Sequence, residues 1–333
     1  MQLLVLKHKS SRTHFHAFIE TVSGHSFLRT LGAMKKRSSW SVSLRFLLVM
    51  GMGPVCGTIH SQNNTDSPFY QAGIAEATVY SDLKTALKAG DAVYKLRLIN
   101  SPFDPKLFPK ITHLTGLQCL MLGSNGITAI PIELTGFRSL LFFSSSKNNL
   151  HALPDEIAAL QNLEYLELFD TRLDSFPQSL CYLHRLKALT FENNLADTFR
   201  LPLNFGELGS LEELTCYKIN IYHLPASMGD FKKLKTFYLS DSKLKSLPSA
   251  LGNLTKLETL VLDNNQLTSL PKNLFKLSNL AYLSLKNNKI AHISDYICYL
   301  TSLAELDLSG NPISEPERDI LHALLPGCRI IYR

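Results

Sequence analysis

The chain has 333 residues, with 34 lysine and arginine residues against 28 aspartate and glutamate residues, and its formal net charge is +6. Residues 1–61 hold eight of the basic residues and one of the acidic residues, which leaves 26 basic and 27 acidic residues, a net charge of −1, in the rest of the chain. Because this larger part is nearly neutral, the overall basic charge does not indicate nucleic-acid binding. The six cysteines contain no CxxC pair and no cluster, so they do not predict a disulfide framework.

Residues 34–61 have the layout of a signal peptide. Three basic residues, Lys35, Lys36 and Arg37, precede an apolar run at 46–55, and small and polar residues follow this run. The run is too short to span a membrane. We therefore predict cleavage after Ser61, with cleavage after Gly57 as the second choice.

Two other interpretations of this leader stay open. The run at 46–55 also fits a buried strand of a separate subdomain. Cys56 is a candidate site for a lipid anchor, although the three residues before it match a lipoprotein cleavage box poorly. If translation starts at Met34, residues 1–33 come from a mis-assigned upstream start or are disordered.

Residues 62–92 are predicted to form a linker and an N-terminal capping helix. The helix is expected at 79–89 and ends before Gly90, which suits the C′ position. Its apolar side would be formed by Val79, Leu83, Ala86 and Leu87.

A unit of about 23 residues repeats ten times through residues 93–313. A fixed period of this size indicates a solenoid, in which the repeated surface rather than an active site is the first place to look for function. The units begin at Val93, Leu117, Leu140, Leu163, Leu186, Leu211, Leu234, Leu257, Leu280 and Leu303.

Each unit predicts one strand and one return segment. In the unit that begins at Leu257, the alternation of Leu260 and Leu262 predicts a short strand with one buried face. Asn265 ends the strand in a turn, where its amide can bond backbone groups of its own unit and the next. Pro271 then breaks the ladder, and the return segment has helical or 3₁₀ spacing.

The Asn position and the unit length vary along the chain. Thr171 and Ser242 can replace the asparagine amide in part, whereas Ile219 cannot. The unit from Leu186 holds two extra residues, which predict a bulged loop at 197–203 on the convex or edge side.

The repeat resembles the typical 23-residue form of the leucine-rich-repeat family, LxxLxLxxNxLxxLPxxLxxLxx, in ten registers from Val93 onward. The resemblance implies an α/β fold, namely a right-handed solenoid or horseshoe whose parallel β-sheet lines a concave face, with helical caps at both ends. Animal extracellular members usually carry cysteine clusters beside the repeats. Since this chain has none and has a leader at Met34, it resembles bacterial exported leucine-rich-repeat proteins.

Residues 314–333 are predicted to form the C-terminal cap. Ser314 and Glu317 have the spacing of a capping box, and Pro316 falls in the first helical turn. A last strand is expected at 329–332. The helix would bury Ile320, Leu321, Leu324 and Leu325.

Outward positions on the concave face become aromatic and acidic between residues 121 and 238. Aromatic side chains are enriched at binding hot spots, and carboxylates favour a basic or polar partner. The alternative is that the aromatic side chains only stabilise neighbouring strands through cross-strand packing. The predicted partner-binding residues are Met121, Phe142, Tyr165, Glu167, Phe169, Asp170, Glu192, Glu213, Tyr217 and Tyr238.

Motifs for catalysis, metals and cofactors give little signal. The sequence contains no HExxH, GxSxG or P-loop motif. The carboxylates of the concave face could pair as glycosidase acids or as Ca²⁺ ligands, but they would point into solvent from a shallow surface. We therefore predict no catalytic residue, no metal and no cofactor.

The sequence thus predicts a non-enzymatic, exported protein of a bacterial periplasm, cell surface or medium that binds a protein, or else a glycan, on its concave face. We expect a monomer without a nucleic-acid partner and without a transmembrane span in the mature chain. The alternative is a cytoplasmic scaffold that regulates a signalling GTPase or phosphatase and keeps residues 1–61. A third possibility, an enzyme acting on a glycan or peptide, would need the carboxylates of the concave face.

Overall fold

The structure is a computed structural model that describes residues 76–101, 108–193 and 197–333. The chain divides into two compact units, Met1–Asn63 and Asn64–Arg333, and every described residue belongs to the second. The signal peptide predicted at 34–61, the upstream stretch 1–33 and the candidate anchor Cys56 lie outside the described residues.

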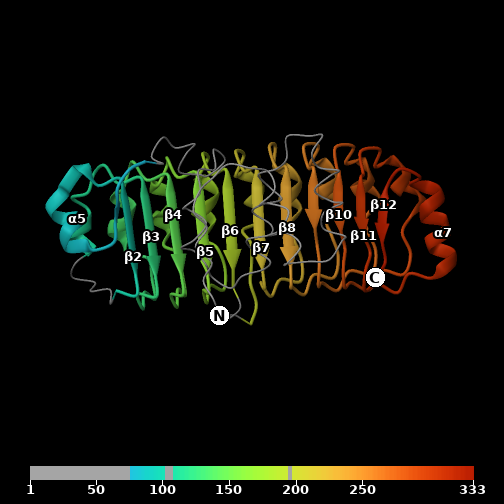
Figure 1. The fold of residues 1–333 in the computed structure, drawn as a ribbon, viewed down its shortest axis with the longest axis horizontal. Helices are drawn as coiled ribbons and strands as arrows, with labels where there is room; N and C mark the ends of the chain where they lie inside the picture. The colour runs from blue at the N-terminus through green and yellow to red at the C-terminus, as the bar shows by residue number, and fades with distance from the viewer. Residues whose placement is uncertain (1–75, 102–107, 194–196) are drawn as a thin grey trace, which may run out of the picture. The chain divides into compact units, whose positions relative to one another are not determined.

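The described residues form a twelve-stranded parallel sheet whose strand order follows the sequence in an open row (Figure 1). Strands β2 to β11 correspond to the ten predicted repeats, and β1 and β12 extend the sheet at its two ends. The predicted solenoid with a parallel sheet is therefore confirmed. The strands are β1 (Val79–Tyr80), β2 (Lys95–Ile99), β3 (Cys119–Gly123), β4 (Phe142–Ser146), β5 (Tyr165–Phe169), β6 (Ala188–Glu192), β7 (Glu213–Tyr217), β8 (Thr236–Ser240), β9 (Thr259–Val261), β10 (Tyr282–Ser284), β11 (Glu305–Asp307) and β12 (Arg329–Ile331).

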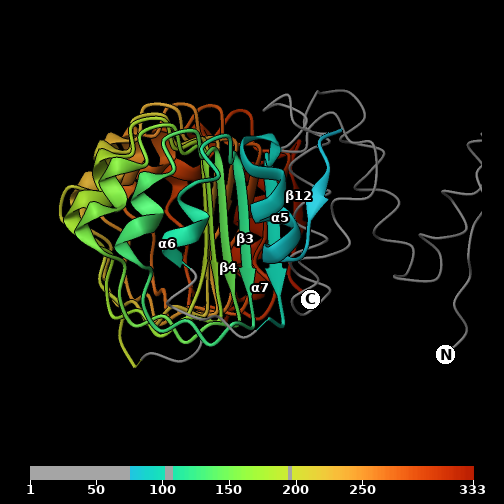
Figure 2. The same cartoon turned by 90° about the vertical axis from the view of Figure 1, so that its left-hand side faces the viewer.

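Short helical segments return the chain from strand to strand on one side of the sheet (Figure 2). Proline in an extended conformation stands immediately before many of them, and Ser294 takes this place in the unit that begins at Leu280. Proline suits this position because it has no N–H for the strand ladder and its φ angle is already helical. The segments are η1 (Gly90–Ala92), α6 (Phe108–Ile111), η3 (Ile132–Gly136), η4 (Asp155–Ala159), η5 (Gln178–Tyr182), η6 (Phe205–Glu207), η7 (Ala226–Asp230), η8 (Ser249–Asn253), η9 (Lys272–Lys276) and η10 (Asp295–Tyr299).

The repeated leucines fill the space between the sheet and the 3₁₀ helices. Leu260 of β9, Leu262 just after it and Leu274 of the return segment are completely buried. Together with their equivalents they form one contiguous hydrophobic core that runs from Ala86 to Leu325. Burying a leucine side chain contributes about 1.5–3 kcal/mol, so this periodic set is the main source of stability.

Buried asparagines satisfy the backbone where the strands end. The side-chain oxygen of Asn265 accepts the N–H of Leu244 at 3.0 Å, and its side-chain nitrogen donates to the carbonyl of Leu239 at 2.8 Å. Asn288 and Asn311 make equivalent bonds to the units before them. A ladder is thus present where the position is asparagine, but it joins the unit to the one before it and not, as expected, to the next.

The unit that begins at Leu186 has a buried asparagine next to its expected ladder residue. Its expected ladder residue, Asn194, lies outside the described residues. The neighbouring Asn193 is fully buried, and its side-chain nitrogen donates to the carbonyl of Leu173 at 2.6 Å. Asn193 thus adds a contact between this unit and the unit before it.

The insertion of the same unit at 197–203 is anchored by one aromatic side chain. Phe199 is buried in the core, where its ring centroid lies 5.0 Å from that of Phe176 and 4.7 Å from that of Phe191. Leu203, near the end of the insertion, is 87 % exposed. The insertion is thus held at its middle and exposed at its end.

The N-terminal helix is shorter than the sequence predicted. Helix α5 spans Leu83–Ala89, because the carboxylate of Asp82 accepts the N–H groups of Lys84 and Thr85 at 3.3 and 2.8 Å and so sets the start. The residues before it, which were expected to be helical, form β1 instead. Gly90 ends α5 with a φ of +58°, which glycine adopts without strain.

Helix α7 spans Glu315–Leu324 and follows Ser314, whose hydroxyl accepts the N–H of Glu317 at 3.4 Å. The Glu317 side chain does not complete the predicted capping box. Its carboxylate accepts the N–H of Ile293 at 2.9 Å and lies 2.9 Å from Nδ1 of His292. Glu317 therefore connects α7 to the last 3₁₀ unit.

The apolar side of α7 is narrower than expected. Leu321 and Leu325 are buried and Leu324 is half-buried, but Ile320 is 44 % exposed, so its predicted burial is wrong. The expected last strand is present as β12, which pairs with β11. Ile320 points away because the end of the solenoid offers only one side of the helix a core to cover.

Candidate partner-binding face

The strands that carry the predicted partner-binding residues are β3 to β8. Strand alternation places these side chains on the sheet face opposite the 3₁₀ helices, which we call the open face and which is the predicted concave face. Asp170 follows β5 directly, in a left-handed turn with φ of +52°. The sequence therefore placed all ten residues on one face.

Parallel register decides which of these side chains are neighbours. Phe142 of β4 pairs with Tyr165 of β5, and Glu192 of β6 pairs with Tyr217 of β7. Met121 and Tyr238 lie five strands apart, about 24 Å at a strand spacing of about 4.8 Å. The set is thus an extended surface of the size that a macromolecular partner contacts.

Met121 and the aromatic side chains of this face other than Phe169 are buried, contrary to the expectation that they are exposed. Exposure is only 2–7 % for Met121, Phe142, Tyr165, Tyr217 and Tyr238. Part of the cause is local, since each side chain is flanked by neighbours on strands about 4.8 Å away. Phe169, at the end of β5, is half-buried and presents the accessible aromatic surface.

Four residues of β3 to β5 form a separate apolar cluster on this face. The open-face cluster consists of Cys119, Met121, Phe142 and Tyr165. Ala77 and Ala188 pack against it. The sequence places Cys119 on this face, as strand alternation requires, but neither Cys119 nor Ala77 is among the predicted partner-binding residues.

The acidic residues of the face are half-buried and are partly neutralised. Lys218 donates from Nζ to the carboxylate of Glu192 at 2.8 Å, and this hydrogen bond raises the pKa of Lys218. The pair is partly exposed, so its contribution to stability is at most about 1 kcal/mol. Lys218 is a residue of the face that the sequence did not single out, and it fixes the position of one predicted carboxylate.

A second group of polar residues lies further along the same face, on β9 to β11. Asp263 is buried, and its carboxylate accepts the hydroxyl of Ser284 at 2.5 Å and the N–H of Lys286 at 3.0 Å. Burial, with a smaller effect of the nearby Asp307, raises the pKa of Asp263 to about 6. Strands β10 and β11 are only three residues long. The N–H of Lys286, just after β10, bonds the carboxylate of Asp263 instead of a carbonyl of the neighbouring strand.

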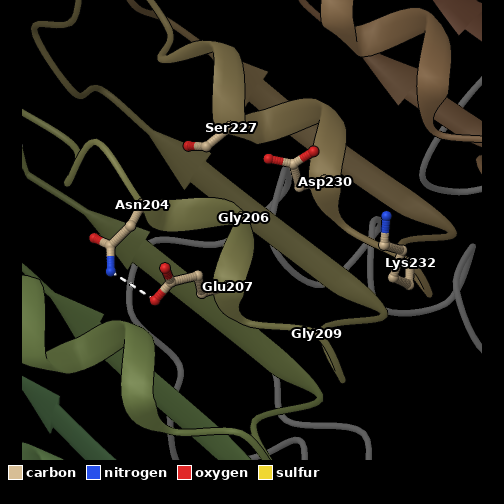
Figure 3. Close-up of a pocket in the computed structure, with 7 residues that line it drawn as sticks. All are labelled: Asn204, Gly206, Glu207, Gly209, Ser227, Asp230 and Lys232. Carbon is tan, nitrogen blue, oxygen red and sulfur yellow. Dashed lines mark hydrogen bonds between the residues drawn. The ribbon is translucent and has the colours of Figure 1, made fainter.

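A shallow depression lies on the helical side between η6 and η7 (Figure 3). Its volume is about 440 Å³. The side-chain nitrogen of Asn204 donates to the carboxylate of Glu207 at 2.7 Å on its rim. Glu207 belongs to η6, whereas Asp230 ends η7 and Lys232 follows two residues later (Figure 3). The depression is lined by Asn204, Gly206, Glu207, Gly209, Ser227, Asp230 and Lys232.

The described residues offer neither a metal site nor a membrane span. In these ranges, histidine, cysteine and acidic side chains form no group that could hold a metal ion. Within the same part of the chain, every helix is too short or too polar to cross a membrane.

Comparisons with known proteins extend the description of the repeats. Three family models match the chain. The model described as leucine-rich repeat matches residues 255–313, the leucine-rich repeat region matches residues 142–237, and leucine-rich repeats (2 copies) matches residues 232–276. A comparison with curated proteins gave no match.

Solved structures similar to this chain come from bacteria and plants. An internalin, InlF of Listeria monocytogenes, is 17 % identical with a TM-score of 0.58, over 77 % of this chain and 79 % of that one. The leucine-rich-repeat domain of the type III effector XopL is 23 % identical with a TM-score of 0.53, over 81 % and 90 %. These two likenesses show the fold.

A third similar structure is the ectodomain of the receptor kinase GASSHO1/SCHENGEN3 from Arabidopsis thaliana. It is 30 % identical with a TM-score of 0.51, over 62 % of this chain, which spans only 25 % of the plant chain. The ten registered repeats, the parallel sheet that they build and the three family models agree, and the chain belongs to the leucine-rich-repeat family.

Proposed function

We propose that the chain is an exported, non-enzymatic binding protein that holds a protein partner on its open face. The observation that carries this proposal is that all ten predicted residues share one face over six adjacent strands. A surface of this extent suits a protein, whereas a small substrate would need a concave pocket. A glycan partner is the second choice on the same surface.

The accessible part of the face defines the chemistry of the partner. Phe169 is half-buried at the end of β5, next to the half-buried carboxylates of Glu167 and Asp170. An aromatic group beside carboxylates favours a partner with an apolar side chain next to a basic one. The plant ectodomain named above was solved in complex with CASPARIAN STRIP INTEGRITY FACTOR 2, which supports binding as a use of this type of scaffold.

The binding proposal is tested with Phe169→Ala in the full chain. The matched control is Tyr182→Ala, which removes a 47 % exposed tyrosine from η5 on the other side of the sheet. A hot-spot aromatic costs ~2 kcal/mol or more, which is about 30-fold in affinity. Partner capture from cells that make the protein should fail or weaken for Phe169→Ala alone. Equal capture by both variants would exclude the open face as the binding surface.

Export is tested separately from binding. N-terminal sequencing of the natural protein should find Gln62, or else Thr58, as the first residue. A chain that still begins at Met1 would contradict export and favour the cytoplasmic scaffold.

A further inference from the structure

Two large aromatic side chains stand exposed on the helical side of the solenoid, in η10. Tyr296 is 45 % exposed and Tyr299 is 60 % exposed, and their ring centroids lie 5.9 Å apart at an interplanar angle of 37°. Cys298, between them in the chain, is also exposed. Exposed rings that stand together offer a contact surface that single scattered apolar residues do not.

Each ring has a lysine of the preceding segment, η9, beside it. The Nζ atom of Lys272 lies 5.3 Å from the centre of the Tyr296 ring, within the range of a cation–π interaction. Lys276 and Tyr299 are 23 residues apart, one full unit, so they occupy equivalent positions on neighbouring turns of the solenoid. Both lysines are exposed. Aromatic and cationic groups therefore lie side by side on this surface.

The charge of the helical side changes sign along the solenoid. The four return segments from η7 to η10 hold five lysines and two aspartates, a net charge of +3, and all seven side chains are exposed. The four from η3 to η6 hold two arginines and four acidic residues, a net charge of −2. The tyrosine pair lies in the positive half, which attracts an anionic partner. The segments are 224–233, 247–256, 270–279 and 293–302 in the positive half, and 130–139, 153–162, 176–185 and 201–210 in the negative half.

These groups match the two kinds of surface that an acidic sugar presents. A pyranose ring has a flat face of C–H groups that can stack on a tyrosine ring, and its carboxylate can pair with an ammonium group. Peptides are commonly held through a free strand edge or a groove, whereas η10 presents the side chains of a short helix. Nucleic-acid binding that relies on about six to ten phosphate contacts needs more cations than five lysines spread over four units supply. The side chains therefore favour an acidic polysaccharide.

We propose that the helical side at η9 and η10 binds a polysaccharide that contains uronic acids. The rings of Tyr296 and Tyr299 stack on sugar rings, and Lys272 and Lys276 pair with sugar carboxylates. The polymer continues toward η7 along the other lysines of the positive half. This goes beyond the proposed function, because the surface lies on the side of the sheet opposite the open face. Both surfaces can therefore be occupied at once.

The first test is calorimetric titration of the full chain with polygalacturonate oligosaccharides, and with methyl-esterified oligosaccharides of the same length. The acid form should bind and the ester should bind much more weakly, because the ester has the same rings without the charge. Tyr299→Ala should raise Kd by roughly 30-fold, as expected for a hot-spot aromatic side chain. Lys276→Gln should weaken binding and reduce its dependence on salt.

Tyr182→Ala is the matched control. Tyr182 occupies the same position in its unit as Tyr299 and is 47 % exposed, but it lies in the negative half, so its removal should leave Kd unchanged. Equal Kd values for Tyr299→Ala and Tyr182→Ala, or an ester that binds as tightly as the acid, would overturn the proposal. Binding to phosphatidylglycerol vesicles without binding to polygalacturonate would also overturn it, since the surface would then take lipid head groups.

The second test needs no variant and holds even if Tyr299→Ala unfolds. Polygalacturonate should slow the alkylation of Cys298 by N-ethylmaleimide several-fold, because the polymer covers the tyrosines on both sides of it. The half-buried Cys328 should react at an unchanged rate. An unchanged rate at Cys298 would overturn the proposal. Phe169→Ala should alter neither readout, so failure of this proposal and failure of the binding proposal for the open face are distinguishable.

Discussion

The 3₁₀ helices of neighbouring units approach each other most closely at a column of glycines. A Cβ atom added at Gly229 of η7 would lie 2.2 Å from the carbonyl oxygen of Ala250 in η8. Gly206 and Gly252 have equally close contacts with the units that follow them. Gly229→Ala therefore tests whether this approach is a requirement of the fold.

The size of the effect follows from the geometry. Non-bonded carbon atoms rest ~3.5–4.0 Å apart, so η7 and η8 must separate by more than about 1 Å to admit the new methyl group. Overpacking of this kind costs ~1–3 kcal/mol, and the contact with a backbone atom places it near the upper limit. Alanine also lowers the conformational entropy of the unfolded chain, which stabilises the folded state by ~0.4–1 kcal/mol. We expect a net loss of about 2 kcal/mol, or ~4–8 °C in Tm for a unit of this size.

Gly136 provides the matched control. It ends η3, a Cβ atom added to it would meet nothing within 4 Å, and its φ is not in the left-handed region. Gly136→Ala should therefore be neutral or slightly stabilising. Thermal unfolding of the two variants, followed by circular dichroism, gives the comparison. If Gly229→Ala and Gly136→Ala unfold at the same temperature, the units are not held at the distance that the structure shows.

Two further predictions concern buried polar groups. Asn265→Ala removes the partners of the Leu244 N–H and the Leu239 carbonyl, and each unpaired group should lower the free energy of unfolding by ~1–3 kcal/mol. Hydrogen exchange of the Leu244 amide should become faster. Exchange at the rate of the unmodified chain would mean that the fold does not need this ladder bond. Burial raises the pKa of Asp263 to about 6 from its ordinary value of 3.8, so the folded state retains a proton that the unfolded state releases, and stability should fall as pH rises between these values. Asp263→Asn keeps a side-chain oxygen that can accept the hydroxyl of Ser284, and it should raise Tm near neutral pH but not below pH ~4. If Tm is unchanged at both pH values, burial of the Asp263 carboxylate does not destabilise the fold.

The period of the sequence was sufficient for the fold because the solenoid is built from local rules. Alternation of Leu260 and Leu262 fixes which face of a strand is buried, and Asn265 and Pro271 fix where the strand ends and the return begins. Each unit then contacts mainly its sequence neighbours, so no distant pairing had to be guessed.

The predictions that were wrong concern side chains whose contacts come from another part of the fold. Glu317 was assigned to its own helix by spacing, but it bonds Ile293 of the unit that begins at Leu280. Ile320 fitted the apolar side of a helix, yet the end of the solenoid does not reach it. Asp82 was a missed signal that the sequence did contain, since a carboxylate before a helix marks its start.

The candidate site divides in the same way. The sequence by itself determined that the ten predicted residues share one face, because side-chain direction along a strand has a period of two. The tertiary structure decided that Tyr165 and Phe142 pack into a buried cluster with Cys119 and Ala77, and that Lys218 neutralises Glu192. Strand period is a local property that places a side chain on a face, whereas burial and charge pairing depend on groups from other units that periodicity does not specify.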